Sequence, residues 1–167
     1  MTNNVLSIIK EEIEKFNRSE YLKWRRNNVT LRGVKEFGRE NNVYGSFGKG
    51  LYTVPLSNKS MAKEYGNVYY VVGGIPQKPK IVRSLNDAEM LRQDLVDKFC
   101  KENDVKYDPQ YFEKNTSIEE QMIKLGFDGI IIKGREMVNF SPNENDVKYF
   151  SNENQLIQYY EYLNNIR

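Results

Sequence analysis

The 167-residue chain contains no histidine, and this absence removes several classes of chemistry. Ser-His-Asp and Cys-His catalysis, histidine general bases and histidine-ligated metals are excluded, so any catalysis must use carboxylates, arginine, lysine, tyrosine or serine. The single cysteine, Cys100, provides neither a disulfide framework nor a paired-cysteine metal site. Because it lies on the apolar side of a predicted helix, we expect a buried structural thiol and no metal.

The chain also lacks a large excess of positive or negative charge. The chain carries 25 Lys and Arg against 23 Asp and Glu, whereas a dedicated nucleic-acid binder usually shows a strong basic footprint. The N-terminal stretch MTNNVLSIIKEEIEKF has early acids and a short apolar run, which fits neither a signal peptide nor a membrane span. We expect one cytoplasmic domain with no membrane contact, and nucleic acid is not the favoured acceptor.

Hydrophobic periodicity predicts a helix first, then strands, two helices, further strands and a closing helix. The first helix is predicted over residues 4–24, with Val5, Ile9, Ile13 and Phe16 on one face. The strands are predicted at residues 29–32, 50–53, 68–72, 80–83, 127–133, 136–140 and 146–150. Because this order lacks a regular strand–helix alternation, it favours an α+β domain with antiparallel sheets.

Capping signals predict where the later helices begin and end. Asn86 with Glu89 has capping-box spacing, and a further helix is predicted from Thr116 to Gly126, a residue suited to a left-handed helix end. Leu156, Tyr160 and Leu163 predict the closing helix. The polar segment 101–117 is expected to form a long surface loop.

The stretch YGSFGKGLY, residues 44–52, packs three glycines around one lysine. It is not a Walker A loop, because only two residues separate Gly45 and Gly48, and Gly50 stands where that loop needs a hydroxyl. A GxGxxG motif is also absent. A glycine-rich turn leading into a strand remains as the plain interpretation.

The run FGKGLY, followed after a few residues by NKS, resembles the NAD-binding core of the ADP-ribosyltransferases, particularly the poly(ADP-ribose) polymerase branch. The resemblance implies that Tyr52 stacks on nicotinamide and that Ser60 hydrogen-bonds the nicotinamide carboxamide. It also implies that Phe47 and Lys49 belong to the cofactor-binding run. Lys49 at a solvated turn tip, and Tyr52 and Ser60 as ordinary core and cap residues, remain alternatives.

Two further motifs follow the order of this family. Leu31-Arg32-Gly33 matches its first motif, a strand that ends in a basic residue and glycine. REMVNFSPNENDVKYF matches its third motif, with Glu136 in the position of the catalytic glutamate. GFDGIII before this strand also resembles ADP-ribosyltransferase domains of phage and mobile-element proteins. The resemblance covers about residues 29–150.

The chain mixes the signatures of two branches of the family. Arg32 stands where the polymerase branch has histidine, and arginine there is typical of the arginine–serine–glutamate toxins and transferases. Lys63 occupies the place of a second stacking tyrosine, for which Tyr65 is the nearest substitute. Gly134 stands where arginine-modifying toxins carry Glu or Gln, which disfavours arginine as the acceptor.

NAD, as co-substrate, would explain these residue types. Glu136 would accept a hydrogen bond from the ribose 2′-OH and stabilise the oxocarbenium charge that forms as nicotinamide leaves. Arg32 would bind the phosphates or the ribose, and Gly33 would leave room for the carboxamide. Pairing of Arg32 with a surface acid and an exposed edge position for Glu136 are the alternatives.

The resemblance implies an ADP-ribosyltransferase-like fold, with two packed, mainly antiparallel sheets around an NAD cleft and flanking helices. Residues 1–28 would form an N-terminal amphipathic helix, 29–150 the NAD-binding catalytic core and 151–167 a C-terminal helix.

The expected function is mono-ADP-ribosylation of a macromolecule, a protein of a host or of the same cell, by a toxin-like or anti-defence effector of a phage or mobile element. Two other functions stay open. One is a catalytically weak module that binds NAD or a partner protein and blocks it. The other is an RNA-modifying relative, which the modest charge and the lack of histidine disfavour.

Overall fold

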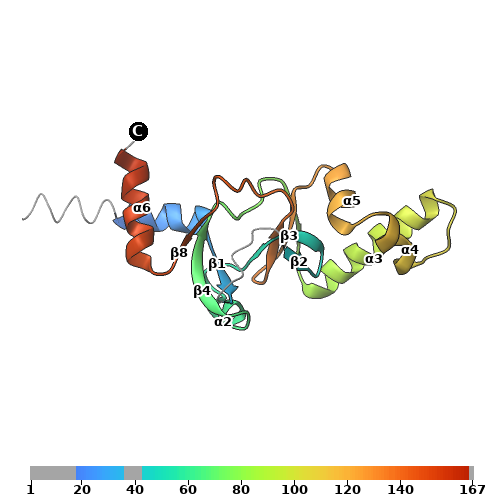
Figure 1. Cartoon of the computed structure of the whole chain (residues 1–167), viewed down its shortest axis with the longest axis horizontal. Coiled ribbons are helices and arrows are strands. Elements are labelled where there is room, and N and C mark those ends of the chain that lie inside the picture. Colours follow the sequence, from blue (N-terminus) through green and yellow to red (C-terminus); the bar gives the residue numbers. More distant parts are fainter. Residues whose placement is uncertain (1–17, 36–42, 166–167) are drawn as a thin grey trace, which may run out of the picture.

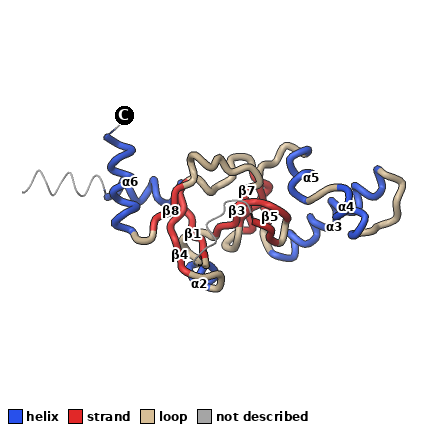
Figure 2. Tube along the Cα trace, viewed as in Figure 1, coloured by secondary structure: helices blue, strands red, loops and turns tan. Residues whose placement is uncertain are grey.

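Two β-sheets form the centre of the chain, flanked by helices at both ends (Figures 1 and 2). The computed structural model describes residues 18–35 and 43–165. One sheet has the order β1-β4-β8 and the other β2-β3-β7-β6-β5. The strands are β1 (Val29–Val34), β2 (Val43–Gly45), β3 (Gly48–Thr53), β4 (Asn67–Val72), β5 (Pro79–Val82), β6 (Gly129–Ile132), β7 (Met137–Asn139) and β8 (Lys148–Phe150).

The helices gather at the two ends of the molecule. Residues 18–28 are helical and lie near α6 at one end, whereas α3, α4 and α5 lie at the other, with the sheets between them (Figure 1). The short α2 packs on β1 and β4. The bounds are α2 (Lys59–Lys63), α3 (Leu85–Glu102), α4 (Pro109–Asn115), α5 (Ile118–Lys124) and α6 (Glu153–Asn165).

The α+β class and the predicted strands are confirmed, and β2 is an additional short strand. Residues 18–28 confirm the described part of the first predicted helix, while Val5, Ile9, Ile13 and Phe16 lie outside the described residues. The strand pairs are antiparallel except β5 with β6, which are parallel. A parallel pair needs a crossover between its strands, and α3, α4 and α5 supply it.

One predicted helix start and one predicted loop were wrong. Helix α3 begins at Leu85, and its cap is Ser84, whose Oγ accepts from the Asp87 N–H at 3.1 Å; Asn86 lies inside the helix. Residues 101–117 are not one loop, because α4 lies within them. The side chain of Asp108 caps α4 by accepting from two backbone N–H groups, and proline occupies the first turn, where its missing N–H costs nothing.

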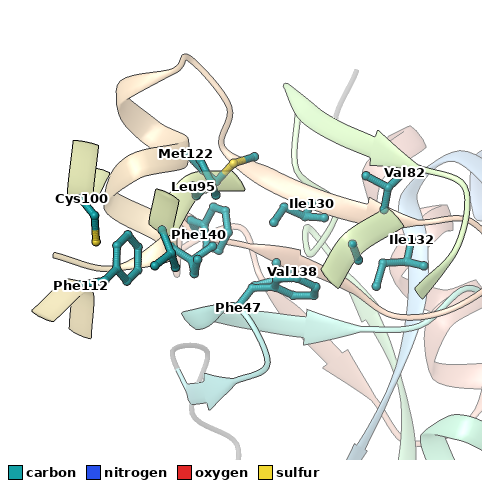
Figure 3. Close-up of a cluster of buried hydrophobic side chains, with 13 residues drawn as sticks. Phe47, Val82, Leu95, Cys100, Phe112, Met122, Ile130, Ile132, Val138 and Phe140 are labelled. Carbon is teal, nitrogen blue, oxygen red and sulfur yellow. The ribbon is translucent and has the colours of Figure 1, made fainter. Parts of the chain in front are cut away.

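The main core lies between the five-stranded sheet and the helices α3, α4 and α5. Figure 3 shows Ile130 and Val138 from the sheet, and Phe47 from the turn between β2 and β3, facing side chains of these helices. Cys100 is fully buried in this cluster, as expected, and its Sγ donates to the Asp108 carbonyl at 3.6 Å. The glycine-rich stretch is thus anchored to the core through Phe47.

A short backbone connection joins the two sheets. Leu31 of β1 and Val54, the residue after β3, exchange two N–H···O hydrogen bonds of 2.8 Å. This bridge brings the middle of β1 beside the end of β3. It is at this junction that the candidate site lies.

Two negative findings hold for the part of the chain that the structure describes. No helix there is both long and apolar enough to cross a membrane. No three Cys, Asp or Glu side chains there come together as a metal site would require.

Candidate functional site

A cavity of about 200 Å³ lies at the junction of the two sheets. Five residues expected from the sequence line it: Arg32, Gly33, Tyr52, Tyr65 and Glu136. They come from β1, from β3, from the segment after α2 and from the turn before β7. The rest of the lining is Leu31, Val43, Tyr44, Gly45, Ser46, Thr53, Val54 and Ala62.

Arg32 places a buried positive charge at this cavity. It is only 8% exposed, and its Nη1 donates to the hydroxyl of Tyr149, whose ring centroid lies 5.8 Å from the guanidinium carbon. Within residues 18–35 and 43–165, no carboxylate lies within 4.0 Å of the Arg32 guanidinium. A cation buried to this extent interacts strongly with charge placed beside it, so an anionic ligand would be stabilised there.

Gly33 has a packing role that the sequence did not suggest. A Cβ at this position would lie 1.8 Å from the carbonyl oxygen of Ala62 in α2. Glycine is therefore required by the close approach of α2 to β1, and this approach also places Tyr65 next to the cavity. That Gly33 also leaves room for the nicotinamide carboxamide stays a prediction.

The glycine-rich stretch is a β-hairpin in which β2 and β3 are joined by Ser46 and Phe47. Gly48 has a φ of +97°, a conformation that disfavours side chains, and its neighbour across the turn is the Glu119 carboxylate of α5. The Tyr52 hydroxyl accepts from the Phe47 N–H at 3.0 Å and donates to the Gly48 carbonyl at 2.6 Å. Tyr52 therefore closes the turn while its side chain lines the cavity.

Burial has the largest effect on the pKa of the Tyr52 phenol. It raises the pKa of the phenol above its ordinary value; the Phe47 N–H acts in the opposite direction, and Glu136 and Glu119 add to the rise. The hydroxyl therefore stays protonated and keeps its proton for the Gly48 carbonyl.

Glu136 lies on the turn between β6 and β7, immediately before β7. Its carbonyl accepts from the Ile132 N–H at 3.2 Å, which closes the turn and fixes the glutamate at the cavity. The side chain is half-buried, and burial raises the pKa of its carboxyl, while Arg135 and Arg92 lower it. A carboxylate held partly out of water interacts more strongly with a nearby positive charge than one in bulk solvent.

Three residues named from the sequence do not line the cavity. Phe47 is 3% exposed and belongs to the core. Lys49 is exposed on the hairpin, with its Nζ 5.5 Å from the centroid of the Tyr44 ring. Ser60 is exposed near the start of α2, and its Oγ donates to Asn58 Oδ1 at 3.3 Å.

Sequence reasoning missed three residues that shape the site. Tyr44 lines the cavity although it is 78% exposed, Tyr149 holds Arg32, and Arg92 reaches the hairpin from α3. Tyr44 stood next to a recognised motif and had a local signal. Tyr149 and Arg92 are brought in by the fold, so no local pattern marks them.

Larger hollows lie elsewhere on the surface. One of about 540 Å³ lies between residues 18–28 and α6, but none of the site residues expected from the sequence lines it. The smaller cavity at the sheet junction is where those residues converge. Its volume is below the roughly 300–1,000 Å³ of typical ligand pockets, so it has room for a small ligand or for part of a larger one.

No protein-family model, curated protein or solved structure matches this chain. The function is therefore inferred from the residues of the cavity and their geometry.

Proposed function

We propose that the chain is a mono-ADP-ribosyltransferase, which transfers ADP-ribose from NAD to a macromolecular acceptor, a protein, and releases nicotinamide. The observation that carries this proposal is the convergence of Arg32, Tyr52 and Glu136 on one cavity. These residues lie far apart in the sequence and come from three different motifs. If the sequence resemblance were accidental, nothing in it would lead us to expect all three residues at the same cavity.

The two charged residues would act at different stages. Arg32, whose guanidinium has no carboxylate within 4.0 Å among the described residues, would bind a phosphate or the ribose of NAD in the ground state. Glu136 would accept from the ribose 2′-OH and oppose the positive charge that grows as the glycosidic bond breaks. The ring of Tyr52 would hold nicotinamide before it leaves.

A second candidate is a module that binds NAD or a partner protein without efficient turnover. Two observations favour it. The Ser60 hydroxyl, expected at the carboxamide, does not line the cavity, and one Arg32 donor is used by Tyr149. In this case the cavity would hold a ligand, but Glu136 would have no chemical step to perform.

Isothermal titration with NAD, followed by incubation of the protein with labelled NAD and cell lysate, tests both candidates. The transferase proposal expects saturable binding and label on a discrete protein band. Binding without label transfer or nicotinamide release supports the second candidate. If the folded protein does not bind NAD, the transferase proposal is wrong.

A further inference from the structure

We propose that Arg92 is a positioning residue, which holds the β2–β3 turn and with it one wall of the cavity. The inference that this wall serves NAD rests on the proposed function. Arg92 lies on α3 and is not part of the cavity lining, so it would act on a ligand indirectly.

Three contacts fix Arg92 against the turn. Its Nη2 donates to the Ser46 carbonyl, and its guanidinium carbon lies 5.0 Å from the centroid of the Phe47 ring. Its Nη1 lies 3.2 Å from Oε2 of Glu89, which is one helical turn earlier on α3. The guanidinium thus contacts both residues of the turn while Glu89 orients it.

The turn is held from both sides. Tyr52 bonds the Phe47 N–H and the Gly48 carbonyl from the β3 side, and Arg92 bonds the Ser46 carbonyl from the α3 side. Ser46 itself lines the cavity, as do Tyr44 and Gly45 before it. Loss of the Arg92 contact would therefore free the segment that forms this wall, although the β2–β3 strand pairing would remain.

Arg92 also acts on Glu136 through its charge. Burial raises the pKa of the Glu136 carboxyl, and the positive charges of Arg135 and Arg92 lower it. The other ionisable side chains at this cavity are Arg32, Tyr44, Tyr52 and Tyr65. Glu119 of α5 acts on Tyr52 from the far side of the turn.

The test compares two variants. Arg92→Gln loses both the positive charge and the planar set of guanidinium N–H donors (the fork), whereas Arg92→Lys keeps only the charge. Arg83→Gln is the control, because Arg83 is exposed and lies directly before the cap of α3. Hydrogen exchange of residues 43–53 reports on the turn without NAD. Carbon-13 NMR of the Glu136 carboxyl and the steady-state constants for NAD report on the site.

For Arg92→Gln we expect about tenfold faster exchange in the turn and about a tenfold higher KM for NAD, the effect of one lost charge-assisted hydrogen bond. The Glu136 pKa should rise. Arg92→Lys should keep this pKa near that of the parent protein while exchange and KM still increase. Arg83→Gln should change none of the three quantities.

Unchanged exchange and KM in folded Arg92→Gln would overturn the proposal. If that variant does not fold, Arg92→Lys decides, because parent-like exchange in it would show that the fork is not needed. If the parent protein does not bind NAD, the proposed function fails separately, and exchange in the turn still decides whether Arg92 positions this wall.

Discussion

Replacement of Glu136 by glutamine removes one charge from the cavity and changes little else. The amide has nearly the size of the carboxyl and still accepts one hydrogen bond from a ribose hydroxyl. A carboxylate about 4 Å from a developing positive charge interacts by about 4 kcal/mol at an effective dielectric constant near 20. Loss of such a transition-state term commonly costs about 3 kcal/mol, so we expect ADP-ribosyl transfer to slow by about a hundredfold or more.

The same substitution should not destabilise the protein at neutral pH. Burial raises the pKa of Glu136 above its ordinary value of 4.5. The stability that this group contributes is therefore fully present below the unfolded-state pKa and is lost as pH rises through the folded-state pKa. Glutamine does not titrate, so Glu136→Gln should gain stability relative to the parent over this pH window and stay at least as stable at pH 7.

Single-turnover transfer and NAD hydrolysis should be measured for both forms, with thermal unfolding from pH 4 to pH 8. Transfer by the parent protein should rise with pH through the raised pKa, because the ionised carboxyl is the form that opposes the oxocarbenium charge. Equal rates in a folded Glu136→Gln variant would remove this residue from the mechanism. Lower stability of the variant at every pH would contradict the assigned cost of burying the charge.

Three other substitutions separate binding from packing. Arg32→Lys keeps the charge but removes the planar fork, so the Kd for NAD should rise about tenfold in calorimetry, with kcat changed less because the NAD phosphates are already charged in the ground state; a fall in kcat at constant Kd would instead assign Arg32 to the transition state. Gly33→Ala places a Cβ 1.8 Å from the Ala62 carbonyl oxygen, and thermal unfolding should show a loss of about 1–3 kcal/mol. Parent-like stability of this variant would mean that α2 does not constrain the position. Tyr52→Phe leaves two backbone groups of the turn without their partner, so urea unfolding should reveal a loss of about 1–3 kcal/mol, and an unchanged midpoint would show that the hydroxyl is dispensable.

The strands could be predicted because their signal is local. Runs such as Val68–Val72 combine β-branched and aromatic residues between turn residues, and each predicted run became a strand. The pairing of strands, by contrast, depends on residues that lie far apart in the sequence. The parallel pairing of β5 with β6 depends on how the chain folds between residues 83 and 128, which periodicity does not show. Helix α4 was missed because it is short, although Asp108-Pro109 has the form of a helix start.

The candidate site also contains some residues that a local sequence pattern marks and others that only the fold brings in. Arg32, Tyr52 and Glu136 were found because each belongs to a recognisable motif, and they line one cavity. Ser60 was expected there from the resemblance of NKS to a family motif, but α2 begins one residue earlier and the Ser60 side chain is exposed. Arg92 was missed because it is 46 residues from Ser46 in sequence, and an arginine on a helix carries no signal for the carbonyl that it bonds.

The pairing of strands from opposite ends of the chain sets when the cavity can exist during synthesis. Strand β3 needs β7, and β4 needs β8, so the early strands must wait for partners made much later. A nascent chain that ends with β6 contains Arg32 and Tyr52 but neither Glu136 nor β7. The candidate site therefore cannot form until β7 has been made, and any transferase activity would begin only after most of this sequence has been synthesised.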